Sequence, residues 1–137
     1  MWLAKAYRGN YYVDLISGLG NAVLVADRSW MENSIPYELF GVSCHVIGAE
    51  ELIASKILVA RRERFDGADV GHLLRARAAE INWERFESML SPLGAAPVVP
   101  GSFAYIYPSR KLSVPQRVWE RLLDRFRSEL RETQGLF

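Results

Sequence analysis

Cysteine and histidine are scarce in this sequence, which has one Cys and two His among 137 residues. One cysteine cannot build an internal disulfide framework, and together with two histidines it cannot complete a closed structural zinc site. No stretch reaches the roughly 18 apolar residues of a membrane span, and no basic leader with an apolar core follows Met1. We therefore expect a cytoplasmic protein that is neither secreted nor inserted in a membrane.

An excess of charge of either sign is also absent. The 17 Lys and Arg residues and the 16 Asp and Glu residues leave a formal net charge of +1, and 50% of the residues are hydrophobic. Such a composition fits neither a disordered chain nor a globally basic nucleic-acid-binding protein. The length allows one domain with a buried core, so we expect residues 1–137 to form a single domain.

Residues 1–48 are predicted to be the strand-rich part of this domain. Aromatic and β-branched runs at 2–7 and 11–16 flank a short loop that contains Gly and Asn, a pattern typical of a hairpin. Residues 28–33 have room for one or two helical turns. Residues 40–47 form a further candidate strand.

Residues 49–137 are predicted to be the helical part, because their apolar positions recur with a period near 3.6. We expect helices over about 49–62, from Asp66, from Asn82 and over about 113–132, the last with an inner stripe of Trp119, Leu123, Phe126 and Leu130. Strands followed by helices predict an α+β fold, a small sheet built on the N-terminal hairpin and packed against about four helices.

Lys56 is the position that most needs an explanation. Helical spacing of 100° per residue places it near the middle of the apolar arc of the 49–62 helix. A buried ammonium must reach outward to water, lose its proton, or meet an anion such as a carboxylate or phosphate. The residue is therefore either a packed lysine at the rim of the core or part of a site.

Asp14 raises the same question in the hairpin, where strand alternation brackets it between Tyr12 and Ile16. It could ligate a metal, pair with Lys56, or lie on an exposed sheet face. A single carboxylate does not make a magnesium site, and no second acid has a spacing that places it beside Asp14. The sequence therefore predicts no metal site.

The densest charge cluster covers residues 61–69. With Lys56, Arg75 and Arg77 it gives six cations against three anions, a surplus that could meet a phosphate, through Lys56, Arg61 and Arg64, or a partner's acidic face. A solvated corner between helices, in which Asp66 and Asp69 act as caps, is the alternative. A nucleic-acid-binding corner is disfavoured by the near-zero net charge.

The strings at 48–56 and 61–74 resemble the C-terminal half of bacterial nucleotidyltransferase-fold proteins of the abortive-infection and toxin–antitoxin type. Residues 2–16 are similar to the hairpin that follows the active-site strand in that family, and residues 105–109 resemble its later Tyr-Pro-Ser stretch. The resemblance covers nearly all of the chain. It implies that Asp14 corresponds to the third metal-binding carboxylate, and that the family's active-site lysine and Arg/Asp cluster correspond to Lys56, Arg64, Asp66 and Asp69.

The family's Gly-Ser turn and Asp-x-Asp pair, which hold magnesium and the triphosphate, lie before this hairpin, whereas the sequence starts at Met1. The resemblance therefore implies a truncated relative, encoded on mobile DNA, that has lost two sheet strands and nucleotidyl transfer. Asp14 and Lys56 would be remnants that now pair with each other, Asp14 being a former metal ligand.

Two functions follow as hypotheses. The first is a non-catalytic nucleotidyltransferase-like protein that needs no cofactor and acts through self-association or a protein partner. We expect a homodimer through residues 1–16, because a hairpin without its neighbouring strands leaves an aromatic-rich surface uncovered. The alternative is a nucleotide-binding protein or nucleotidyltransferase that uses Mg²⁺ with Asp14, Lys56, Arg64 and Asp69, and that a second chain completes.

Overall fold

The structure is a computed structural model that describes residues 3–19, 23–59, 66–91 and 114–134. Its elements, in chain order, are β1 (Leu3–Arg8), β2 (Tyr11–Ile16), β3 (Gly18–Leu19), β4 (Leu24–Val25), α1 (Arg28–Glu32), β5 (Ile35–Leu39), β6 (Val42–Val46), α2 (Ala49–Leu58), α3 (Gly67–Arg77), α4 (Trp83–Leu90) and α6 (Gln116–Gln134). The predicted α+β class is confirmed.

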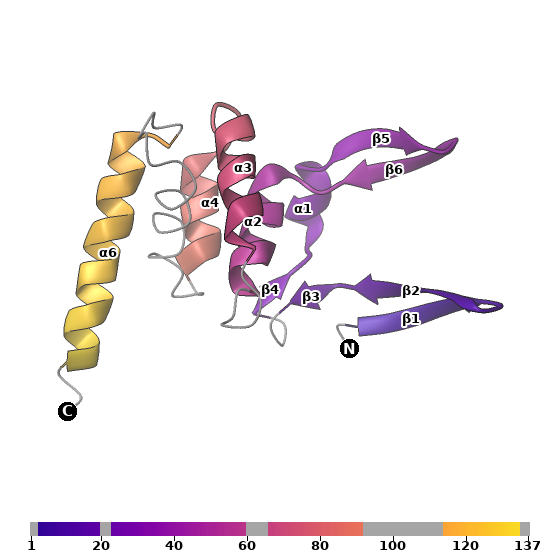
Figure 1. Cartoon of the computed structure of the whole chain (residues 1–137), viewed down its shortest axis with the longest axis horizontal. Helices are drawn as coiled ribbons and strands as arrows, with labels where there is room; N and C mark the ends of the chain where they lie inside the picture. The colour runs from indigo at the N-terminus through magenta and orange to yellow at the C-terminus, as the bar shows by residue number, and fades with distance from the viewer. Residues whose placement is uncertain (1–2, 20–22, 60–65, 92–113, 135–137) are drawn as a thin grey trace.

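The core lies among the helices, which stand side by side at one end of the molecule (Figure 1). Ile53 and Ile57 of α2, Leu74 of α3, and Phe86 and Leu90 of α4 are almost completely buried, and Val118 and Leu122 of α6 join the same cluster. Each of these four helices buries one stripe against the others, and this packing of an amphipathic face supplies most of the stability of a helix in a protein.

The strands form three separate two-stranded antiparallel ribbons instead of one sheet. Two of them, β1–β2 and β5–β6, extend in the same direction away from the helices, with α1 near their bases (Figure 1). We call them the β1–β2 arm (residues 3–16) and the β5–β6 arm (residues 35–46). All residues of β1, β2 and β5 are exposed. In β6 four residues are exposed and Cys44 is partly buried.

The turns of both arms have the backbone geometry that two-residue hairpin loops require. Gly9 has a φ of 59° at the tip of the β1–β2 arm, and Phe40 and Gly41 have φ values of 52° and 78° at the tip of the β5–β6 arm. Positive φ is easy for glycine but costs about 1–2 kcal/mol for a residue with a side chain. Phe40 is therefore in a strained backbone conformation at the tip, where the residue is 96% exposed.

Several boundary predictions are corrected by the structure. The predicted strand 40–47 is wrong at its start, because Phe40 and Gly41 form a turn and β6 begins at Val42. The strand β5 was not predicted. The helix predicted to reach residue 62 ends at Leu58, with Val59 as its C-cap.

The inner stripe predicted for the last helix is wrong in part. Leu123 and Leu130 are 42% and 47% exposed, whereas Val118 and Leu122 are buried and Trp119 and Phe126 are partly buried against the core. The stripe is therefore turned toward the Val118 side. The Tyr-Pro-Ser stretch at 105–109 lies outside the described residues.

None of the described helices has the length and apolar character needed to cross a membrane.

Candidate functional site

Lys56 does not lie in the middle of the buried face of α2, so that prediction is wrong. The buried side chains of this helix are Glu51, Ile53, Ala54 and Ile57, and Lys56 lies at their margin with 22% of its side chain exposed. Its Nζ donates to Asp69 Oδ2 at 2.7 Å and to Asp66 Oδ2 at 3.4 Å. The three side chains tie the C-terminal end of α2 to the N-terminal end of α3.

Lys56 and Asp69 border an open hollow of about 360 Å³, lined also by Leu52, His72, Leu73 and Ala76. The hydrogen bond that Lys56 donates to Asp69, opposed by partial burial, raises the pKa of Lys56 above its ordinary 10.5, and the same hydrogen bond lowers the pKa of Asp69 below 3.8. Lys56 thus keeps its proton at neutral pH. Two carboxylates already compensate its charge.

The same shifts predict a pH-dependent contribution to stability. A lowered folded-state pKa means that the Asp69 carboxylate stabilises the fold above its unfolded pKa of about 3.9, and that this contribution is lost as the pH falls through the folded pKa. We expect Asp69→Asn to lower the melting temperature at pH 7 and to lower it less at about pH 2, measured by circular dichroism.

Asp124→Asn is the matched control for this experiment, because Asp124 pairs with Arg127 on the exposed surface of α6 and 73% of its side chain is accessible. It should change the melting temperature little at either pH. A loss from Asp69→Asn of the same size at both pH values would contradict the assigned ion pair.

Asp14 does not pair with Lys56, and this prediction is also wrong. Its Oδ1 accepts a hydrogen bond from Lys5 Nζ at 2.6 Å, and the same ammonium lies 4.3 Å from the ring centroid of Tyr12. The ladder register places Lys5 directly opposite Asp14, and a cross-strand neighbour is nearer than any residue on another element. The two predicted remnants therefore belong to different parts of the fold.

Of the other predicted site residues, the structure describes Asp66 and Asp69 beside Lys56 and places Asp14 on another element. Arg61 and Arg64 lie outside the described residues. Asp66 is the N-cap residue of α3 by position but makes no side-chain cap bond, because its carboxylate is turned to Lys56. Within residues 3–19, 23–59, 66–91 and 114–134, no group of three or more His, Cys, Asp or Glu side chains could hold a metal ion.

The buried charge of α2 is Glu51, which is 0% exposed. Its Oε1 accepts a hydrogen bond from Nη2 of Arg85 on α4, whereas its Oε2 and Arg85 Nη1 are buried without a hydrogen-bond partner among the described residues. A Cβ at Gly48 would overlap with Glu51 Oε2, so the absence of a side chain at Gly48 makes room for this carboxylate. The sequence reading missed this pair because acids in a first helical turn normally serve the helix dipole.

Further polar contacts join the ion pair to α1, the helix at the base of the β5–β6 arm. Arg85 Nη2 also donates to Ser29 Oγ at 3.3 Å, and the Asp27 carboxylate caps α1 by accepting from Ser29 N at 2.8 Å. The hydrogen bond from the Ser29 side chain is the main cause that lowers the pKa of Asp27. The Glu51–Arg85 pair thus connects α2 and α4 with the helix that leads into the β5–β6 arm.

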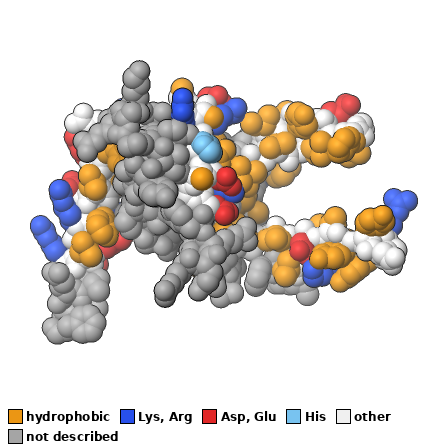
Figure 2. Space-filling view, in the orientation of Figure 1, with side chains coloured by type: hydrophobic (Ala, Val, Ile, Leu, Met, Phe, Trp, Pro, Cys, Tyr) orange, Lys and Arg blue, Asp and Glu red, His pale blue; other side chains and the backbone are white. Residues whose placement is uncertain are grey.

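Hydrophobic side chains gather along both arms (Figure 2). Of the 18 exposed large apolar side chains in the described residues, 13 lie on the arms. Scattered apolar residues are normal on protein surfaces, but clusters of this kind mark binding sites or aggregation hazards. The structure thus places its candidate functional site on the arms.

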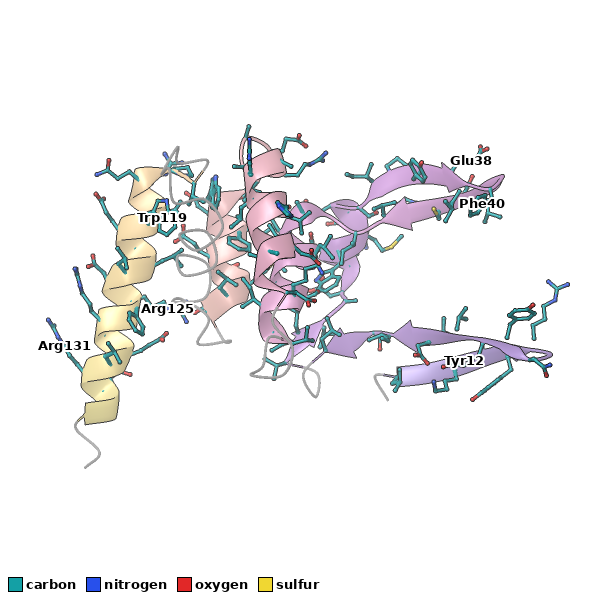
Figure 3. All side chains as sticks on the ribbon, viewed as in Figure 1. Tyr12, Glu38, Phe40, Trp119, Arg125 and Arg131 are labelled. Atoms are coloured by element: carbon teal, nitrogen blue, oxygen red, sulfur yellow. The ribbon has the colours of Figure 1, made fainter. Side chains whose placement is uncertain are left out.

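The register divides the β5–β6 arm into two different faces. One, here called the apolar face of the β5–β6 arm, combines the pairs Ile35–Val46, Tyr37–Cys44 and Leu39–Val42. The other carries Pro36, Glu38, Ser43 and His45. Glu38 projects from the side of this arm that is turned away from the β1–β2 arm, and Phe40 lies at the tip (Figure 3).

The sequence contains the pattern of this hairpin, although our sequence analysis predicts only its second strand. Apolar residues alternate at 35, 37 and 39 and again at 42, 44 and 46, with Phe-Gly between the two runs. Two alternating runs around a two-residue loop that contains glycine predict a hairpin. Two residues weaken this pattern. Pro36 argues against a strand, and phenylalanine is unusual in a two-residue hairpin turn.

Comparison with known proteins finds no matching family model, no similar curated protein and no similar solved structure.

Proposed function

We propose that this chain is a non-catalytic association protein, whose two arms bind a protein chain while the helical part holds them in place. The observation that carries the proposal is the exposure of both arms along their whole length. An isolated two-stranded hairpin is at best marginally stable in water, and it needs a third strand or a packed face. A bound protein chain supplies that cover.

The contacts of the predicted active-site residues favour association over catalysis. Lys56 is held by Asp66 and Asp69, and Asp14 is held by Lys5. Each charge already has a partner of opposite sign, which lowers the affinity that Lys56 or Asp14 would have for a nucleotide or a metal. The resemblance to nucleotidyltransferase-fold proteins supports the same proposal, since the family sheet would provide the strands that the hairpin lacks.

Photo-crosslinking of the full chain in living cells tests this function. The photoreactive residue p-benzoylphenylalanine replaces Val42 on the apolar face of the β5–β6 arm or, as matched control, Ser43 on the opposite face of the same strand. Both side chains are exposed, so neither replacement removes core contacts. We expect a discrete covalent adduct from position 42 and much less from position 43. Equal labelling at both positions, or no adduct at either, would contradict the proposal.

A further inference from the structure

A cavity of about 200 Å³, here called the base pocket, lies where the bases of both arms meet the helical part. Ile16, the last residue of β2, and Ile47, the residue after β6, both border it. Its other walls include Leu19 of β3, Leu24 of β4, Trp30 of α1 and Ser55 of α2. A group seated in the base pocket can therefore touch the base of each arm at the same time.

The chemistry of the lining selects an apolar occupant. The two serines at the base pocket are engaged within the chain, because Ser55 Oγ donates to Glu51 O at 2.7 Å and Ser17 O accepts from Ala26 N at 2.9 Å. Among the described residues that line it, none is Lys, Arg, Asp or Glu. Burial of a polar or charged group without a partner is unfavourable, whereas burial of apolar surface is favourable. The lining therefore favours a hydrocarbon group over a nucleotide or another phosphate.

The volume of the base pocket sets the size of this occupant. Sites for drug-sized ligands and cofactors measure about 300–1,000 Å³, which is more than the base pocket provides. An apolar cavity of about 150 Å³ is known to bind benzene, so the available space suits one six-membered ring. In a protein chain such a group is the side chain of phenylalanine. Trp30 in the wall can add an aromatic contact to it.

We propose that the base pocket is the anchor point of the association surface, and that it receives a phenylalanine side chain of the bound protein chain. This inference rests on the proposed association function and specifies the chemistry of its partner. A few aromatic anchors in small desolvated pockets carry most of the binding energy of an interface. Ile16 links the pocket to the surface of the arms, because it borders the pocket and is itself 50% exposed on the β1–β2 arm.

Toluene, which corresponds to the phenylalanine side chain without its backbone, tests the pocket in the full chain. Its ring current should shift the ¹³C-methyl NMR signals of Ile16 and Ile47 until they saturate. Ile35 is the control, because it is 43% exposed on the β5–β6 arm and is not part of the described lining. Benzylammonium has the same ring with a charge and should give no saturable shift. Absence of saturation at Ile16 and Ile47, or equal saturation at Ile35, would overturn the inference.

Ala26→Phe tests whether the partner uses the pocket, since it places a ring there from within the chain. Ala26 is exposed and lines the pocket, so the substitution adds bulk at the pocket and not in the core. Val25→Phe is the matched control, because Val25 is the preceding residue, is 49% exposed and is not part of the described lining. We expect Ala26→Phe to block the toluene shifts and to weaken the association by about 30-fold or more, as loss of a hot-spot side chain does. The photo-adduct at position 42 should disappear in Ala26→Phe and persist in Val25→Phe.

The two experiments separate failure of the anchor from failure of the association. If Ala26→Phe blocked toluene but left the position-42 adduct unchanged, the partner would not use the pocket, and the inference would fall while the association function stood. Equal loss of the adduct from Ala26→Phe and Val25→Phe would also overturn the inference, because the pocket would not be selected over the neighbouring surface. Absence of the adduct from the otherwise unaltered chain would instead contradict the association function itself.

Discussion

Replacing Val42 by lysine is expected to abolish the proposed association of the arms with a protein chain. Val42 is 64% exposed in the single chain, so the substitution leaves the helical core untouched. In the proposed complex the new ammonium would be buried against the bound chain without an anion beside it. Desolvation of an unpaired ion costs several kcal/mol, so the dissociation constant should rise by about 100-fold or more. The measurement is the loss of the photo-adduct that p-benzoylphenylalanine forms at position 37, on the same apolar face.

Ser43→Lys is the control for this prediction. Ser43 is the next residue of the same strand and is exposed on the opposite face, where it pairs with Glu38. The same charge at this position should leave the dissociation constant within a few-fold of wild type and should not alter the circular dichroism spectrum. If both lysine variants weakened the association equally, the loss would have to be assigned to charge on the arm in general and not to burial of its apolar face.

Replacing Glu51 by alanine is expected to cause the largest loss of stability among substitutions of charged residues. The change leaves the Arg85 guanidinium, whose side chain is only 20% exposed, without its carboxylate partner. Removal of one member of a buried ion pair typically costs about 3–5 kcal/mol, because the remaining charge is buried without compensation. Urea unfolding followed by tryptophan fluorescence measures the free energy of unfolding.

The double variant Glu51→Leu with Arg85→Met separates the ion pair from simple packing. It removes both charges and keeps apolar volume, so it should recover most of the stability that Glu51→Ala loses. Gly48→Ala provides a second measurement, since its Cβ displaces the Glu51 carboxylate and lies 3.2 Å from Asn33 O. Its expected cost is about 1–3 kcal/mol. Wild-type stability in both Glu51→Ala and Gly48→Ala would contradict the buried position of this side chain.

The elements that depend on local pattern could be predicted from the sequence. The β1–β2 hairpin follows from two β-forming runs around a Gly-Asn turn. The helix α4 begins directly after Asn82, whose side chain accepts a hydrogen bond from Arg85 N at 3.1 Å, as an N-cap residue should. Both depend on contacts between residues that are close in the chain. Their physical causes are therefore present in any short window of the sequence.

The orientation of the helices could not be obtained in the same way. On α2 the apolar arc of the sequence is broad enough to include Lys56, yet packing against α3 and α4 turns the helix so that Glu51 is buried and Lys56 is at the margin. On α6 the same effect buries Val118 and exposes Leu123. Hydrophobic periodicity defines a stripe, but the neighbouring helices select its centre.

The sequence by itself determined the α+β class and the first hairpin, because turn chemistry and hydrophobic period act over a few residues. Only the tertiary structure decided which charges meet. It paired Asp14 with Lys5, Lys56 with Asp66 and Asp69, and Glu51 with Arg85. It also showed that both arms extend away from the core and that their strands are exposed to solvent. Ion pairing and exposure depend on distances between elements, which local preferences along the chain do not specify.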